Sequence, residues 1–231
     1  MPEPNHKALA HLMAGVTRSV LWEAWSESTH QGPPARLHCR AGRGRATYHR
    51  FHPHSNRHEI VFGALMVADK QMPDRGENWL STREVRRRAY WNGEVSTLNL
   101  LAHTCCHEFA HLQQHCIGQR HYGQVHNPAF YQLLDGLHAS GAADEVRRQL
   151  ERQARAQQLQ IDAQPWPAPA AGTLQSLFQP GDHVRFGQGK HLKTGRIVKI
   201  NRRTCTVEGM GRIAGRRYRV PGPLLEKISR Q

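Results

Sequence analysis

The sequence predicts an α+β protein in which a domain of helices with a small sheet is followed by a small all-β domain. Apolar residues recur at helical spacing in residues 5–30 and again in residues 98–116. Between these runs, residues 58–67 are apolar and rich in strand-forming side chains. After residue 180, short stretches alternate apolar and polar residues between turn-forming residues, a pattern typical of a small barrel.

The first domain, residues 1–160, begins with a helix and two strands. Leu, Met, Val and Trp recur at helical spacing in residues 5–30, and the Gly-Pro-Pro at residues 32–34 ends that helix. Residues 36–48 and 58–67 are predicted as strands, and the second has the stronger apolar, β-rich composition.

A short helix is predicted at residues 81–90, whose sequence is STREVRRRAY. Ser81 or Thr82 is placed to cap its N-terminus, and Glu84 stands at the position of a capping box. The three arginines at residues 86–88 either contact phosphate or form an ordinary solvated face.

The motif His107-Glu108-Phe109-Ala110-His111 lies inside a helix predicted over residues 96–116. Residues four apart on a helix share one face, roughly 5–6 Å apart along the axis. Both imidazoles can therefore reach one zinc ion, and Glu108 can take a proton from a metal-bound water. The motif predicts a Zn²⁺ site with His107 and His111 as ligands and Glu108 as the general base for peptide-bond hydrolysis.

A catalytic zinc site needs a third protein ligand, and the nearby candidates are His103, His115, His121 and His126. The first two lie on the same helix, four residues before His107 and four after His111. Each step of four residues overshoots a full turn by about 40°, so a straight helix does not easily bring three such histidines to one tetrahedral metal ion. We favour His126, because Asn127 fits a helix N-cap and Pro128 fits the first helical position, so the histidine before them is held by a rigid element. His121, in a loop flanked by glycines, is the alternative.

At these residues the sequence resembles the SprT-like zinc metallopeptidases, which include the Spartan-type proteases of DNA–protein crosslinks. In that family the H-E-x-x-H helix is followed, after a loop, by a third histidine and then a phenylalanine four residues on. The corresponding residues here are His107, Glu108, His111, His126 and Phe130. The resemblance extends over residues 5–140 in the order of elements and is specific in residues 98–134. It implies a zincin-like metallopeptidase domain with three histidine zinc ligands, a glutamate base and an association with DNA.

The cysteines mark a departure from that family. Many SprT-like proteins end in a cysteine-rich zinc ribbon, whereas the five cysteines here form no C-x-x-C pair. A function that depends on such a ribbon is therefore in doubt. The sequence also has no apolar run near 18 residues and no signal-peptide pattern, so a cytoplasmic protein without a membrane association is expected.

After the motif, residues 127–140 are predicted as a helix and residues 142–160 as a charged helix that connects rather than forms core. Residues 161–176 are rich in Pro and Ala and are predicted as a linker. Residues 177–231 then form the second domain.

Four short strands are predicted in this second domain, at residues 180–186, 194–201, 205–208 and 217–220. Through these runs the domain resembles SH3-like barrels of the KOW and Tudor-like kind, which bind RNA, DNA, protein or peptide tails. The resemblance implies a small all-β SH3-like barrel.

Positive charge is concentrated in this part of the chain. The formal net charge is +14, and residues 178–231 hold 13 Lys and Arg against 3 Asp and Glu, whereas the first 177 residues hold 19 against 15. Such a basic excess indicates a polyanionic partner, most plausibly nucleic acid, and DNA more than RNA. The residues predicted to bind it are Arg185, Lys193, Arg196, Lys199, Arg202, Arg203, Arg217 and Arg219.

Two functions follow from the sequence. The first is a zinc-dependent endopeptidase that acts on nucleic-acid-associated proteins, including proteins crosslinked to DNA. The second is a nucleic-acid-binding protein whose zinc site is structural or vestigial. A zinc hydrolase acting on another substrate is a third interpretation.

Overall fold

The computed structural model describes residues 5–28, 36–77, 79–121, 123–167, 174–187, 192–201 and 204–228. The chain divides into two compact units, residues 1–166 and residues 167–231, so the boundary lies inside the predicted Pro/Ala-rich linker. Trp166 is buried against Val85, Val95 and Leu100 of the first unit. The architecture is α+β, with one small sheet in each unit.

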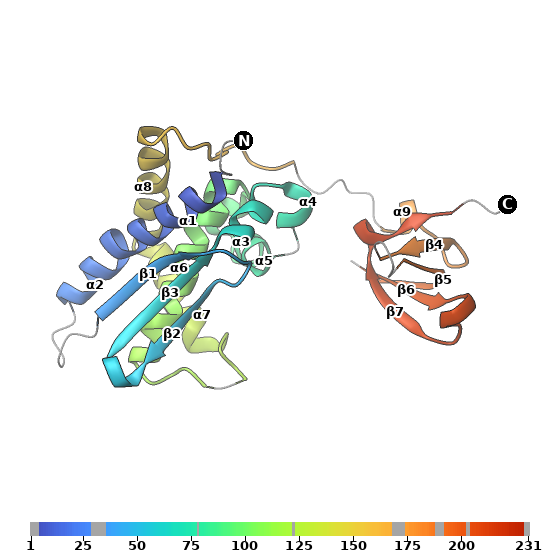
Figure 1. Cartoon of the computed structure of the whole chain (residues 1–231), viewed down its shortest axis with the longest axis horizontal. Coiled ribbons are helices and arrows are strands. Elements are labelled where there is room, and N and C mark those ends of the chain that lie inside the picture. The colour runs from blue at the N-terminus through green and yellow to red at the C-terminus, as the bar shows by residue number, and fades with distance from the viewer. Residues whose placement is uncertain are drawn as a thin grey trace. The chain divides into compact units, whose positions relative to one another are not determined.

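The first unit contains a three-stranded sheet in the order β1-β3-β2 (Figure 1). β1 (Arg36–Gly42) runs parallel to β3 (Arg57–Gly63), and β2 (Tyr48–His52) pairs antiparallel with the other side of β3. The predicted strand at residues 36–48 therefore ends early, at Gly42, and the chain turns after it. β2, which begins at Tyr48, is an edge strand that was not predicted.

One face of this sheet carries the core and the other is polar. Ile60 and Phe62 of β3 are fully buried in the main core cluster. On the opposite face, Arg40 pairs with Glu59 at 2.9 Å. The alternation follows the two-residue period of a strand.

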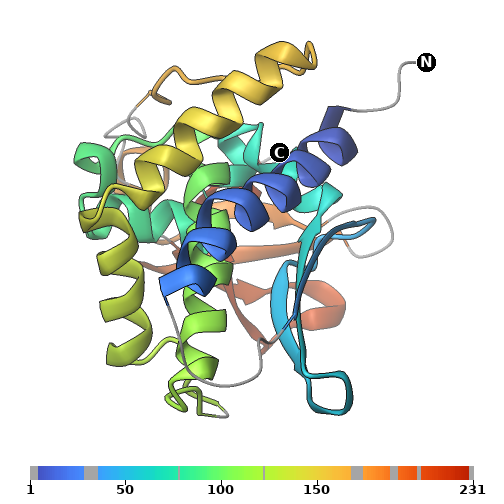
Figure 2. The ribbon, with the colours of Figure 1, turned by 90° about the vertical axis from the view of Figure 1, so that its left-hand side faces the viewer.

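The N-terminal helical segment covers the apolar face. It comprises α1 (Asn5–Val16), a π-helical stretch η1 (Thr17–Trp22) and α2 (Glu23–Ser28). The predicted helix is confirmed over these residues. α1 packs against β1, β3 and α8, and Figure 2 shows α1 and α8 beside each other.

The predicted strand at residues 58–67 ends earlier, at Gly63. A Cβ at this position would collide with the carbonyl oxygens of Gly44 and Ala46, so the close approach requires glycine. The chain then turns into α3 (Ala64–Lys70), which buries Met66 and Val67 from a helix instead of a strand. A short helix, α4 (Pro73–Gly76), follows.

The predicted short helix is α5 (Leu80–Arg87), but its capping differs. Its N-cap is Trp79, without a side-chain cap, while Ser81 and Thr82 are buried within the first turn. Thr82 instead donates to the carbonyl of Gly76 at 2.6 Å. Glu84 is thereby free for another role, described below.

Two helices carry the motif region, and both begin where the sequence predicts. α6 (Thr97–Cys116) is capped by Ser96, whose hydroxyl accepts from Asn99 N at 3.1 Å. α7 (Pro128–Ala139) is capped by Asn127, whose side chain accepts from Phe130 N at 3.0 Å. Each cap satisfies an otherwise unpaired N–H of the first turn.

The charged helix α8 (Ala142–Ala156) belongs to the core, which corrects its predicted role as a connector. Val146 and Leu150 are fully buried, and α8 packs against α6, α7 and α1. Small residues on this face, Ala143 and Ala154, give few apolar anchors in sequence yet allow close helix packing.

The second unit is a five-stranded sheet in the order β7-β6-β5-β4-β8. Its elements are α9 (Leu174–Leu177), β4 (His183–Phe186), β5 (Lys193–Ile200), β6 (Thr204–Gly209), β7 (Arg217–Pro221) and β8 (Glu226–Lys227). The four predicted strands are present. Within the described residues β7 and β8 do not pair, so no closed barrel is found.

Short 3-10 turns complete both units: η2 (Pro53–Ser55), η3 (Tyr90–Gly93), η5 (Gly211–Ile213) and η6 (Gly222–Leu224). Among the described helices, none has the length and apolar composition needed to cross a bilayer.

Candidate metal centre

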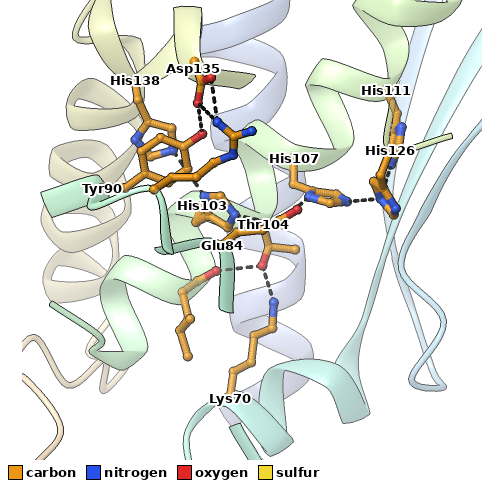
Figure 3. A network of polar contacts seen from close by, with 12 residues as sticks. Lys70, Glu84, Tyr90, His103, Thr104, His107, His111, His126, Asp135 and His138 are labelled. Carbon is orange, nitrogen blue, oxygen red and sulfur yellow. Dashed lines mark hydrogen bonds and ion pairs between the residues drawn. The ribbon is translucent and has the colours of Figure 1, made fainter. Parts of the chain in front are cut away.

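Three of the predicted histidines converge in the first unit. His107 and His111 project from one face of α6, and His126 reaches them from the loop before α7 (Figure 3). The Nε2 atom of His126 lies 3.2 Å from Nε2 of His111 and 3.2 Å from Nε2 of His107. One ligand atom of each residue lies within 4.8 Å of the others.

These separations fit a zinc ion. Zn–N bonds of about 2.0–2.1 Å at tetrahedral angles hold two ligand nitrogens roughly 3.3 Å apart. The observed 3.2 Å between ring nitrogens matches that spacing. His126 is exposed while His111 is buried, so the centre lies at the protein surface. The donor set, three imidazoles, is one that zinc and several other transition metals accept.

Burial keeps His111 in the form that binds metals. Desolvation, together with the positive potential of His107, Arg120 and His126, lowers the pKa of His111 to about 2. Its imidazole is therefore neutral at ordinary pH, with a lone pair available. Phe130, fully buried, stacks on this ring with centroids 4.3 Å apart.

Gln114 ties the loop of His126 to α6. Its Nε2 donates to the carbonyl of Val125 at 3.0 Å and to Oδ1 of Asn127 at 2.9 Å. These bonds fix the residues on both sides of His126. His121, the alternative ligand, is exposed and forms an isolated bridge with Gln124. Among the described residues, the group of three histidines that could hold a metal ion consists of His107, His111 and His126 and does not include His121.

His103 lies on the same face of α6, but its Nε2 atom is hydrogen-bonded to Glu84 and not directed at the three histidines. Oε2 of Glu84 accepts from His103 Nε2 at 2.9 Å and from His107 Nδ1 at 3.0 Å (Figure 3). Burial alone would raise the pKa of Glu84, but these hydrogen bonds outweigh it and hold that pKa well below its usual range. The carboxylate therefore stays charged, and it orients the His107 ring with Nε2 toward the other two histidines.

Glu108, the predicted base, is 6% exposed. Burial raises the pKa of its carboxyl, and the nearby charges of His107, Lys70 and Arg120 oppose the rise. Within the part of the chain that the structure describes, no hydrogen bond occupies this carboxylate. A raised pKa makes this carboxylate a stronger base than an ordinary glutamate, which suits it to accept a proton.

Lys70 is a buried cation next to this carboxylate. Its Nζ donates to Oγ1 of Thr104, and burial lowers its pKa to about 8, while Glu108 and Glu84 pull it back up. The sequence gives no local indication of Lys70 or of the Glu84 contact, because both come from elements outside α6.

The last histidine of α6, His115, faces the sheet. It lies against Phe51 of β2 with ring centroids 4.6 Å apart. Arg120, in the loop after α6, contacts Nδ1 of His49 at 2.5 Å. The edge strand β2 is thereby fastened beside the C-terminal end of the motif helix.

The predicted basic residues of the second unit lie mostly on one face of its sheet. Cross-strand partners share a face, and the register pairs Arg196 with Glu208, Glu208 with Arg217, Lys199 with Thr206 and Thr206 with Arg219. Arg185 joins them through β4, since His183, two residues before it, pairs with Arg196. The opposite face carries the core residues Val184, Ile197, Val207 and Val220.

Not all of these charges are available. Arg185 is bound by Glu226 at 2.6 Å, and Glu208 lies 3.5 Å from Arg196 and 3.9 Å from Arg217.

Lys193 lies on the core side, paired with Phe186 and placed over the ring of Tyr218 at 5.7 Å. Lys199 and Arg219 are exposed and have no acidic partner among the described residues. Arg202 and Arg203 lie outside the described residues.

The chemistry of the centre rests on three imidazoles, a buried glutamate beside them and a carboxylate behind His107. No family model, no curated protein and no solved structure matches this chain.

Proposed function

We propose that this protein is a zinc-dependent endopeptidase. The observation that carries the proposal is the convergence of the Nε2 atoms of His107, His111 and His126, with the free, buried carboxylate of Glu108 on the same helix. A zinc ion held there would supply a Lewis acid and a water acidified enough to attack a carbonyl.

The residues of the chain divide the remaining work. Glu108 accepts the proton of the attacking water at a carboxylate oxygen and passes it to the leaving amine. Glu84 holds the Nδ1 proton of His107, which fixes the tautomer needed for metal binding. Among the described strands β2 pairs with β3 alone and lies beside α6, where an extended peptide can add as a further strand.

The proposed substrates are nucleic-acid-associated proteins, including proteins crosslinked to DNA. The support is the basic face of the second unit and the motif likeness to SprT-like peptidases. Lys199 and Arg219 contribute its unpaired charges, which suit phosphate contacts of DNA or RNA.

Metal content of the purified chain tests the centre. Wild type should bind one zinc ion, His126→Ala should lose it, and the matched control His121→Ala should keep it. Glu108→Gln should keep the zinc and lose cleavage of a protein substrate on DNA. Zinc-loaded Glu108→Gln that cleaves at the wild-type rate would contradict the mechanism.

A second function is supported by the basic face itself: a nucleic-acid-binding protein with a structural zinc site and no protease activity. The supporting observation is the cross-strand row of Lys199, Thr206 and Arg219. Salt-dependent DNA binding by the full chain, together with no cleavage of any protein by its zinc-loaded form, would favour this function.

A further inference from the structure

A basic cavity lies next to the metal centre, between α5 and α7. Its volume is about 680 Å³, and its walls include Leu80, Arg83, Arg87, Arg88, Tyr131 and Asp135. Arg83 and Arg87 belong to α5, and Arg88 follows its last residue. All three guanidinium groups therefore reach the cavity from one short segment.

Two of these three charges have no ion-pair partner among the residues that the structure describes. Arg88 is paired with Asp135 at 2.7 Å and lies over the ring of Tyr131 at 4.1 Å. Arg83 and Arg87 are exposed, and neither forms an ion pair with any described residue. They are four residues apart, so their like charges repel on the same face of α5, and a bound anion would relieve that repulsion.

The cavity adjoins the three histidines. Glu84, which also lines it, hydrogen-bonds to His107, and the ring of Tyr131 lies 6.4 Å from that of His126. A group bound in this cavity therefore contacts side chains that themselves touch the proposed metal ligands.

We propose that this cavity is a substrate subsite for an acidic side chain, Asp or Glu, near the scissile peptide bond. The inference rests on the proposed peptidase function. Arg83 and Arg87 would bind the carboxylate through charge-assisted, bidentate hydrogen bonds. Leu80 and Tyr131 provide apolar surface for the methylene groups of that side chain.

The lining favours one carboxylate over a nucleic-acid strand. The lining has three arginines against the two carboxylates of Glu84 and Asp135, a formal excess of one positive charge, which balances one carboxylate but not a run of phosphates. A single acidic side chain needs only the two free guanidinium groups.

Cleavage specificity tests the subsite. The zinc-loaded full chain is given a peptide library, and the cleavage sites are mapped by mass spectrometry. Wild type should enrich Asp or Glu at one position near the scissile bond, by about tenfold. The double substitution Arg83→Glu and Arg87→Glu should replace this preference with one for Lys or Arg. The control, Arg43→Glu with Arg152→Glu, makes the same change in net charge outside the cavity and should keep the acidic preference.

A binding measurement separates the subsite from the activity. A fluorescein-labelled peptide with two adjacent glutamates is titrated against zinc-loaded Glu108→Gln, with and without the Arg83 and Arg87 substitutions. The substitutions should weaken binding about tenfold or more, and a glutamine version of the peptide should bind as weakly as the variant.

Each outcome decides a different point. No cleavage by wild type, with arginine-dependent peptide binding, would refute the peptidase and leave the cavity as a binding site for acidic side chains rather than a substrate subsite. If wild type cleaves peptides but neither its specificity nor its peptide binding depends on Arg83 and Arg87, the subsite is refuted and the peptidase function is not. If the substitutions weaken binding of an oligothymidylate more than that of the acidic peptide, the cavity binds phosphodiesters and the proposal is wrong.

Discussion

Replacing Glu84 should weaken zinc binding without touching a ligand. One carboxylate oxygen accepts from both His103 and His107, at 2.9 and 3.0 Å, and the side chain is 4% exposed. Loss of an outer carboxylate that orients a metal-bound histidine costs about 10–100-fold in metal affinity. That range corresponds to about 1.4–2.7 kcal/mol. Glu84→Gln is the informative change, because its amide oxygen can still accept both hydrogen bonds and only the charge is lost.

Competition with a chromogenic chelator measures the zinc dissociation constants of wild type, Glu84→Gln and Glu77→Gln. Glu77 is the control carboxylate, because it is paired with Arg86 of α5 and contacts no histidine among the described residues. Thermal melting of the metal-free proteins shows whether the fold is intact. If Glu84→Gln binds zinc within twofold of wild type, the contribution assigned to the negative charge of Glu84 is wrong.

Three further perturbations have defined outcomes. Phe130→Ala removes a fully buried ring and should lower the free energy of unfolding by about 3–5 kcal/mol in urea titrations. Burial lowers the pKa of His58 to about 4, so the unfolded chain binds the proton first as the pH falls. Stability should therefore decrease from about pH 6.5 toward pH 4, and His58→Phe should flatten that slope in urea midpoints. Lys199→Ala with Arg219→Ala should reduce the salt dependence of duplex DNA binding by about two units of slope, while Arg185→Ala, already paired with Glu226, should change it less.

The parts of the fold that depend on local chemistry were predictable. Ser96 caps α6, and Asn127 with Pro128 starts α7, because a cap needs only the residues within one turn of it. The same local logic brought His126, rather than His121, to the motif helix. At these positions a few neighbouring residues are enough to predict where a helix begins and where the histidine before it lies.

The parts of the fold that depend on contacts between distant residues were not predictable from the sequence. The apolar run from residue 58 to 67 suits a strand or a buried helix equally, and the close approach at Gly63 decides where one becomes the other. Glu84 stands at a capping position in sequence, yet its partners are His103 and His107, about 20 residues further along the chain. Only the packing of α5 against α6 brings them together.

The hydrogen bonds around the three histidines also favour one tautomer of His107 and of His111. These tautomers suit a cation bound between the Nε2 atoms. Gln114 directs its NH₂ group to two acceptors, Val125 O and Asn127 Oδ1, so its amide oxygen faces Nδ1 of His111 at 3.4 Å and accepts from it. The carboxylate of Glu84 likewise accepts a hydrogen bond from Nδ1 of His107. In the tautomer with the proton on Nδ1, each of these rings turns a bare Nε2 lone pair toward His126. One proton on His126 could satisfy only one of the two at full strength, whereas a divalent cation satisfies all three nitrogens at once.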